Sequence, residues 1–203
     1  MTHTEDVTLA ELLCARLCHD LAGPVGAAAA GAELLEDGGD GETAALVAIS
    51  AAGAVARLKF FRAALGPSGS PQPAAAMRDL AAAYLKSAMA GGGMAMTLKW
   101  DCQADRLDGD VARLALNLVL IARDALPRGG EVAVAIATTG AIIVGFHGTG
   151  AGLGAEAAAA LAPGGQSDGP RGAQAWLTRR LAEKIGRNIR LEVDSAGGRI
   201  SSG

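Results

Sequence analysis

The chain has 203 residues, enough for one large domain or two small ones, and its aromatic share of only 3% predicts a core of small and aliphatic side chains. A formal charge of -3 excludes a general attraction to nucleic acid or to anionic lipid, and we see no run of about 18 apolar residues that would predict a membrane span. The first residues lack the order of a signal peptide and the three cysteines form no disulfide framework, so we expect a cytoplasmic protein.

Two long helical patterns occupy the N-terminal third of the chain. The first runs from about residue 8 to 36, and Thr8 and Glu11 have the spacing of a capping box at its start. Glycines and aspartates at residues 37–41 end it. The second runs from about residue 42 to 65 and stops at Gly66 and Pro67. These patterns predict an antiparallel helical hairpin.

The second helix carries two apolar seams, of which a two-helix hairpin covers only one. The seams consist of Leu46, Ile49, Gly53, Ala56 and Phe60 on one side and of Val47, Ala51, Ala54, Leu58, Phe61 and Leu65 on the other. The remaining seam predicts a second copy of the hairpin, so that a homodimer forms a four-helix bundle. The alternative is that the C-terminal part of the same chain covers it.

A segment rich in Gly, Ser and Pro at residues 67–73 is a linker between the hairpin, residues 1–66, and a second domain, residues 74–203. In that domain we expect helices near residues 74–90, 110–126, 155–161 and 174–185. We expect strands near residues 96–102, 131–138, 141–146 and 189–193, with a turn at Thr139 and Gly140. Helices interleaved with an antiparallel strand pair predict an α/β sandwich, so the fold class of the whole chain is α+β.

His19 is the residue of the first helix best suited to chemistry. On a helical projection it lies opposite the apolar stripe, and its neighbours one turn away are small, namely Ala15, Ala22, Gly23 and Gly26. An exposed imidazole can act as a nucleophile towards a phosphoryl group. Asp20 can orient the ring, and Pro24 should kink the helix just after it.

Two other interpretations of His19 stay open from geometry alone. The residue can be an ordinary solvent-exposed histidine. It can also belong to a metal site with Cys14 and Cys18, which is less favoured because we expect both cysteines to point towards the packed side of the helix.

Residues 19–24, His-Asp-Leu-x-x-Pro, resemble the H-box of the dimerisation and histidine-phosphotransfer domain of two-component signalling proteins. The longer run from Arg16 to Ala27, the run from Glu33 to Glu36 and residues 57–66 are similar to the ChpT-type histidine phosphotransferases of alphaproteobacteria. The resemblance covers nearly the whole chain and departs at Gly23, where we expect a serine. It implies that His19, with Asp20 beside it, accepts a phosphoryl group from a receiver-domain aspartate of a hybrid histidine kinase. His19 then passes this group to response regulators, and the receivers supply the Mg²⁺.

The second domain resembles the ATP-binding domain of histidine kinases, with Asn117 to Ala122 in the place of its N-box. Ile121 stands where such kinases carry a magnesium-binding Asn, and Phe146 stands where they carry the adenine-binding Asp. A glycine-rich stretch at residues 148–154 has no P-loop lysine, and His147 beside it reads as an ordinary strand-end residue. The resemblance therefore implies a degenerate domain that binds neither ATP nor a metal, and a chain without autokinase activity.

A receiver that reaches His19 should lie across the small-residue face made by Ala15, Ala22, Gly23, Pro24 and Gly26. The cations Arg57, Lys59 and Arg62 of the second helix should attract its acidic surface. Two alternatives remain. Tight binding of ATP and Mg²⁺ would favour a divergent histidine autokinase, and full function after His19→Ala would favour a non-catalytic helical-bundle adaptor or kinase inhibitor.

Overall fold

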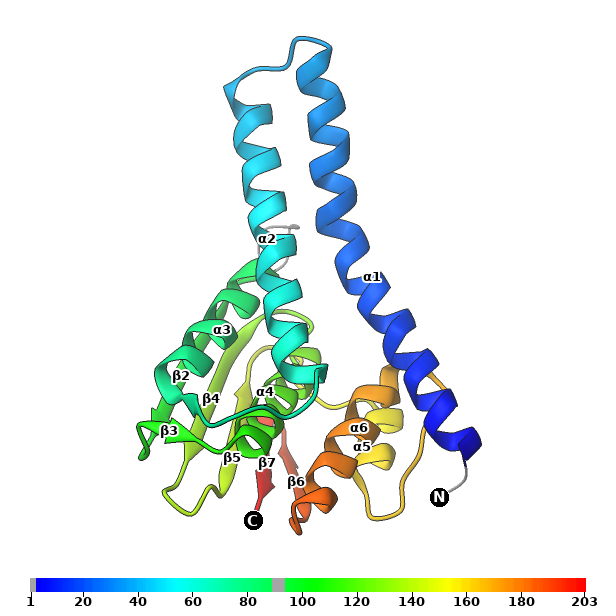
Figure 1. The fold of residues 1–203 in the computed structure, drawn as a ribbon, viewed down its shortest axis with the longest axis vertical. Coiled ribbons are helices and arrows are strands. Elements are labelled where there is room, and N and C mark those ends of the chain that lie inside the picture. Colours follow the sequence, from blue (N-terminus) through cyan, green and yellow to red (C-terminus); the bar gives the residue numbers. More distant parts are fainter. Residues whose placement is uncertain (1–2, 89–93) are drawn as a thin grey trace.

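The structure is a computed structural model that describes residues 3–88 and 94–203. Two long antiparallel helices, α1 (His3–Glu36) and α2 (Gly41–Leu65), rise from a unit of mixed helices and strands (Figure 1). Asp40 caps α2, because its Oδ1 atom accepts hydrogen bonds from the amides of Glu42 and Thr43 at 3.1 and 3.0 Å. The predicted helical hairpin is therefore present.

Helix α1 begins earlier than its sequence pattern indicates. It starts at His3, and the Thr8 hydroxyl donates to the Thr4 carbonyl at 3.0 Å inside the helix, so the predicted capping box is wrong. The extra turns are held by the C-terminal unit. Asp6 lies 2.6 Å from the Arg180 guanidinium on α6 (Pro170–Lys184), and Glu5 accepts a hydrogen bond from Gln166. The first turns of α1 thus contact the C-terminal unit rather than ending at a local cap.

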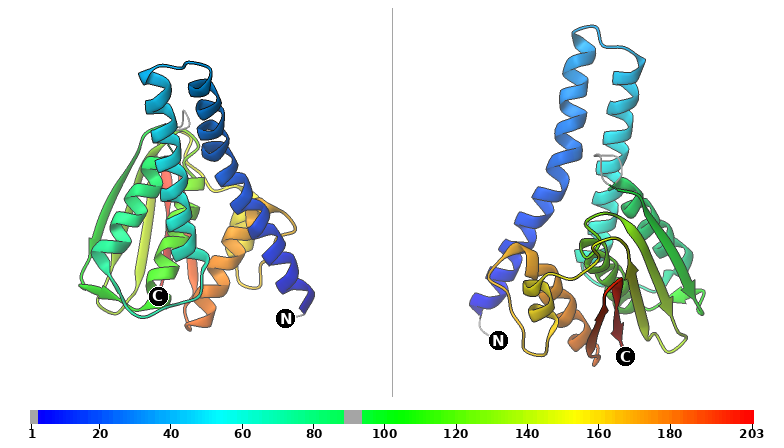
Figure 2. Two further views of the ribbon diagram at one scale, coloured as in Figure 1. Left: turned by 45° about the horizontal axis from the view of Figure 1, so that its top comes forward. Right: turned by 180° about the vertical axis from the view of Figure 1, so that it is seen from behind.

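The C-terminal unit begins with β1 (Gln72–Pro73) and α3 (Ala74–Ser87) and continues through β2 (Met96–Cys102), β3 (Arg106–Leu107), α4 (Gly109–Asp124), β4 (Gly130–Ile136), β5 (Ile142–His147), α5 (Ala155–Leu161), α6, β6 (Ile189–Asp194) and β7 (Gly197–Ser202). The main sheet has the order β2-β4-β5-β7-β6, in which only β2 and β4 run parallel, and β1 pairs with β3 separately. Helices α3 and α4 lie against one face of the sheet (Figure 2). A helical N-terminal part followed by a sheet-containing domain confirms the α+β prediction.

The core lies between that sheet face and α4. Residues 114–122 of α4 are all buried, and they pack against alternate residues of the central strands, including Val132, Val134, Ile142 and Val144. This alternation matches the period of two that a half-covered sheet requires. The predicted helices and strands of this unit occur within a few residues of their expected ends. Residues 89 and 90 of the first predicted helix lie outside the described residues.

Three strands were absent from the sequence-based expectation, namely the two-residue strands β1 and β3 and the sheet strand β7. β7 contains Gly197 and Gly198, and it pairs with both β5 and β6. A Cβ atom on Gly198 would lie 2.6 Å from the Phe146 ring, so the glycine makes room for a buried aromatic side chain.

Helix α2 joins the hairpin to the C-terminal unit. Phe60 and Phe61 are buried, and Phe60 stacks on Tyr84 of α3 with ring centroids 4.2 Å apart. Arg113 and Asn117 of α4 donate to the main-chain carbonyls at the end of α2. The lower ends of both seams are therefore covered by the same chain, as the alternative interpretation holds.

Higher on the hairpin, apolar side chains remain exposed. Leu46, Ile49 and Leu58 are 47%, 54% and 55% exposed, and Val25 and Leu34 are also exposed. Among the described helices α2 alone is long and apolar enough to cross a membrane by composition, with a mean hydropathy of 1.6 over 18 residues. One such helix is weak support for a span, and α2 packs against α1, α3 and α4 as a bundle helix does.

Candidate functional site

His19 projects from the exposed side of α1, as its helical projection predicts. Its side chain is 88% exposed, and Nδ1 lies 3.2 Å from Oδ1 of Asp20. An ionised carboxylate only accepts hydrogen bonds, so this contact favours the tautomer with the proton on Nδ1. That tautomer leaves the Nε2 lone pair available on an exposed side chain.

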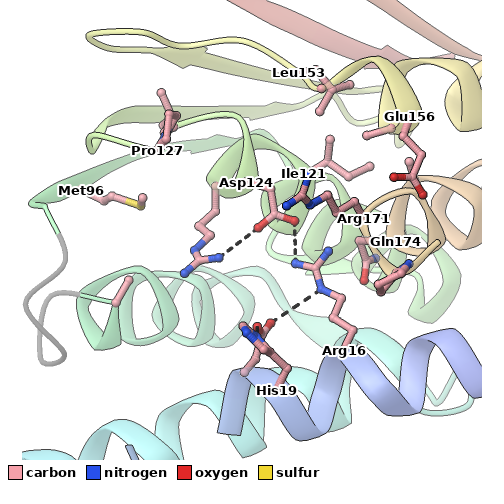
Figure 3. A pocket seen from close by; sticks show the side chains of 18 of the residues that line it. Arg16, His19, Met96, Ile121, Asp124, Pro127, Leu153, Glu156, Arg171 and Gln174 are labelled. Atoms are coloured by element: carbon pink, nitrogen blue, oxygen red, sulfur yellow. Dashed lines mark hydrogen bonds and ion pairs between the residues drawn. The ribbon is translucent and has the colours of Figure 1, made fainter. Parts of the chain in front are cut away.

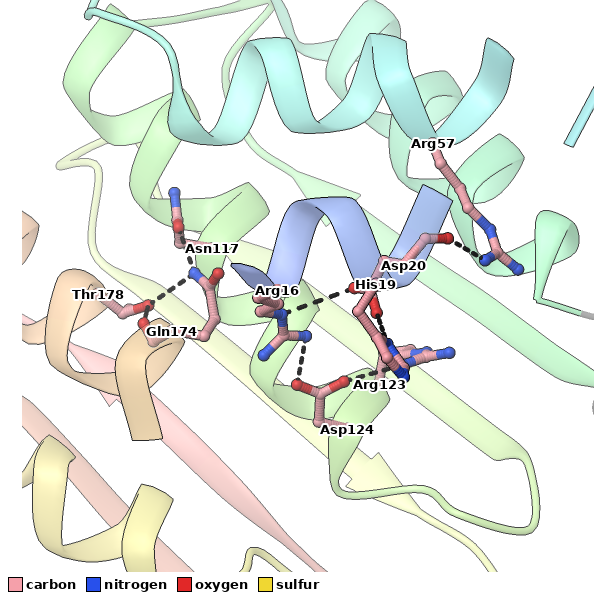
Figure 4. Close-up of polar contacts among 9 residues, drawn as sticks. All are labelled: Arg16, His19, Asp20, Arg57, Asn117, Arg123, Asp124, Gln174 and Thr178. Carbon is pink, nitrogen blue, oxygen red and sulfur yellow. Dashed lines mark hydrogen bonds and ion pairs between the residues drawn. The ribbon is translucent and has the colours of Figure 1, made fainter. Parts of the chain in front are cut away.

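Asp20 also belongs to a chain of charges that reaches the C-terminal unit (Figure 4). Arg16 Nε lies 3.6 Å from Oδ2 of Asp20, and Arg16 Nη2 lies 2.6 Å from Oδ2 of Asp124. Asp124, the last residue of α4, pairs with Arg123 at 3.0 Å. Burial lowers the pKa of the Arg16 guanidinium, but the charges of Asp124 and Asp20 outweigh it and hold the pKa above its ordinary value. Arg16 therefore stays charged beside the carboxylate that faces His19.

A cleft of about 890 Å³ separates this turn of α1 from the C-terminal unit (Figure 3). His19, Asp20 and Arg16 lie on its α1 side. The opposite side is lined by apolar, charged and neutral polar residues that include Met96, Ile121, Leu153, Glu156, Arg171 and Gln174. Sequence reasoning missed this cleft and the role of Asp124. No local pattern signals them, because they arise only when α1 and α4 meet in space.

The predicted small-residue face is open. Ala15, Ala22, Gly23 and Gly26 are exposed, and a Cβ atom added to either glycine would meet nothing within 4 Å. Pro24 is half-buried.

The three cations of α2 differ in their surroundings. Lys59 and Arg62 are exposed, as their predicted docking role requires. Arg57 is half-buried, and each of its three guanidinium nitrogens donates a hydrogen bond inside the chain, one to the Asp20 carbonyl and two to Ser87. The prediction that Arg57 presents its charge to a partner is therefore corrected, because these donors hold α1 and α2 to α3.

The cysteines near His19 also differ from expectation. Cys14 and Cys18 are exposed, so the prediction that they face a packed side is wrong. The lower half of α1 leans away from α2 in Figure 1 and contacts α6 instead. Among the described residues, no group of three or more His, Cys, Asp or Glu side chains is arranged to hold a metal ion.

The polar residue of the predicted N-box serves the fold. Asn117 is fully buried, donates to the carbonyls of Ala64 and Arg113, and accepts a hydrogen bond from Gln174. Ile121 lines the cleft with an apolar side chain, and Phe146 is buried in the core. His147 lies exposed at the end of β5. The two positions that the sequence analysis compared with the Mg²⁺-binding Asn and the adenine-binding Asp of kinases thus carry apolar side chains.

Comparison with known proteins finds similarity to bacterial phosphotransferases. Residues 78–197 match the family of the histidine phosphotransferase C-terminal domain. The chain is 39% identical over 130 residues to the protein phosphotransferase ChpT of Brucella abortus (strain 2308), an alignment over 62% of this chain and 59% of that relative. A solved bacterial phosphotransferase is similar over 100% of this chain and 98% of its own, with a TM-score of 0.83 and 28% identity.

Proposed function

Because the chain belongs to the histidine phosphotransferase family, we propose that it relays phosphoryl groups between receiver domains through His19. The observation that carries the proposal is the exposed imidazole whose Nδ1 faces Asp20 and whose Nε2 is free. The donor is the receiver domain of a hybrid histidine kinase, and the acceptors are response regulators. Mg²⁺ belongs to the receiver, so the chain itself needs no metal and no ATP.

The chemical step needs little from the chain beyond this imidazole. The Nε2 lone pair attacks the phosphorus of an aspartyl phosphate on the receiver, an N–P bond forms, and the acyl-phosphate P–O bond breaks to release the receiver carboxylate. The ring becomes cationic while it keeps its Nδ1 proton. Asp20 stabilises that charge, as a carboxylate does for an imidazolium in a catalytic triad. The same step in reverse passes the phosphoryl group to the next receiver.

A homodimer is part of the proposal. Leu46 and Ile49 on one seam of α2 and Leu58 on the other are exposed, and a second hairpin would bury apolar area of this kind to complete a four-helix bundle. The free thiols of all three cysteines suit a reducing cytoplasm, where receiver domains of two-component systems act. The autokinase alternative is disfavoured by the apolar side chains of Ile121 and Phe146, and the adaptor alternative leaves the pairing of His19 with Asp20 without a purpose.

The test is incubation with a phosphorylated receiver domain and Mg²⁺. We expect acid-labile, base-stable label on the native chain, and none when the chain receives ATP and Mg²⁺ alone. His147→Ala is the matched control, because His147 is an exposed histidine outside the site. Label that survives His19→Ala would overturn the proposal.

A further inference from the structure

Pro24, the last residue of the H-box, leaves one main-chain carbonyl without its helical partner. In an α-helix the amide of residue i donates to the carbonyl of residue i−4, and proline has no amide hydrogen. Pro24 lies inside α1, so the carbonyl that loses its partner is that of Asp20. This is the residue whose carboxylate faces His19.

A side chain from α2 replaces the missing donor. Arg57 Nη1 donates to the Asp20 carbonyl at 2.6 Å. The other two nitrogens of the same guanidinium donate to Ser87, Nε to its hydroxyl at 3.3 Å and Nη2 to its carbonyl at 3.1 Å. Ser87 is the last residue of α3, and its hydroxyl donates to the Tyr84 carbonyl at 2.6 Å. One planar group therefore ties the H-box turn to α2 and to the end of α3. Figure 4 shows its contact with Asp20.

We propose that Arg57 is a positioning residue for phosphoryl transfer: it fixes the main chain of Asp20 where Pro24 has removed a hydrogen bond, and so fixes the carboxylate that orients the His19 ring. Arg57 does not touch the reacting atoms, and the inference rests on the proposed function of His19. Packing alone does not require such a group at this point, because Phe60 and Phe61 already join α2 to α3.

The test is a double-mutant cycle with Pro24. Arg57→Met keeps an unbranched side chain but removes every donor, and Pro24→Ala returns an amide to the Asp20 carbonyl. With saturating phosphorylated receiver, we expect Arg57→Met to lower the single-turnover transfer rate about 10- to 100-fold, since small misplacements of a reacting group have effects of that size. The receiver concentration at half saturation should not change. In the Pro24→Ala background the same Arg57→Met change should lower the single-turnover transfer rate much less than it does in the native chain.

Two further variants separate the loss of hydrogen bonds from the loss of charge. Arg57→Lys keeps the charge but cannot serve three acceptors, so its rate should fall between those of the native chain and Arg57→Met. Arg78→Met removes an exposed arginine of α3 and should leave the rate unchanged. Circular dichroism checks that each variant is folded. A receiver-docking role for Arg57 would instead raise the half-saturating concentration, and would overturn the proposal.

A second readout does not depend on transfer. Nitrogen-15 NMR of the His19 imidazole should show the proton on Nδ1 in the native chain and a mixture of tautomers in Arg57→Met, with Nδ1 restored in the double variant. An equal loss of rate in both Pro24 backgrounds, or an unchanged His19 spectrum in Arg57→Met, would overturn the positioning role. If the native chain accepts no phosphoryl group, the proposed function fails, and the NMR result still decides the role of Arg57.

Discussion

Arg16 Nη2 lies 2.6 Å from Oδ2 of Asp124, and this ion pair joins the turn of α1 that carries His19 to the end of α4. The side chain of Arg16 is only 11% exposed, and its other charged neighbour is Asp20. The C-terminal unit therefore contacts the H-box turn directly. The C-terminal unit thus helps to hold Arg16 in place beside Asp20, which faces His19.

Replacement of Asp124 by Asn should destabilise the chain, because Arg16 would keep its charge in a mostly buried position without its closest partner. We expect the free energy of unfolding to fall by about 1–3 kcal/mol, the usual range when a hydrogen bond to a buried charged group is lost. Urea unfolding measures it. Asp79→Asn, which breaks an exposed pair with Arg78, is the control and should change stability by less than about 1 kcal/mol. Equal losses of unfolding free energy in the two variants would show that the Arg16–Asp124 pair does not stabilise the chain more than an exposed pair does.

Leu58 and Phe61 should respond differently to a negative charge, although both lie on the same predicted seam. Leu58 is 55% exposed in the single chain, so Leu58→Glu should dissociate the proposed dimer and leave the fold intact. Phe61 is 2% exposed and contacts Tyr84, so Phe61→Glu should unfold the chain. Sedimentation and circular dichroism separate the two outcomes. A Leu58→Glu protein that remains a dimer would place the interface elsewhere.

Tyr84 offers a spectroscopic probe because it is the only tyrosine of the chain. Burial raises the pKa of its phenol to about 12. The folded chain holds the phenolic proton more tightly than the unfolded chain, whose tyrosine titrates near pH 10, so this contribution to the free energy of unfolding is complete below about pH 10 and is lost as the pH rises towards 12. Phenolate absorbance should appear in the folded chain only well above the pH at which it appears in urea. Titration near pH 10 with a native circular dichroism spectrum would contradict the burial of Tyr84.

Bulk at Gly23 or Gly26 should block a receiver without disturbing the fold. Space is open around both positions, and glycine is a poor helix former, so Gly23→Trp and Gly26→Trp should not weaken α1. We expect both variants to slow transfer from a phosphorylated receiver. Gly41→Trp also adds bulk in open space, but at the far end of the hairpin, so it should leave the transfer rate unchanged. Native transfer rates in both variants would show that receivers dock on another surface.

The sequence predicts the parts of this structure that depend on local pattern. Helical periodicity indicates α1 and α2, and apolar alternation indicates β4 and β5. The exposure of His19 follows from its place opposite the apolar stripe.

The features that local pattern does not predict are set by distant contacts. In the first turns of α1 Asp6 contacts Arg180, 174 residues away, and in β7 Gly198 lies against the Phe146 ring. The partner of Arg57 is a carbonyl 37 residues earlier, and the need for it arises from a proline. Charge alone suggested that Arg57 would bind a partner protein, and only the packing of three helices shows that it binds its own chain.

The central claim, that His19 carries the phosphoryl group between two proteins, is tested most directly by a chase. The native chain is loaded from a phosphorylated receiver, separated from it, and mixed with a second, unphosphorylated receiver and Mg²⁺. The account predicts that label leaves the chain and appears on the second receiver, that His147→Ala behaves like the native chain, and that His19→Ala never loads. Label that stays on the chain, or a His19→Ala protein that loads and discharges, would contradict it.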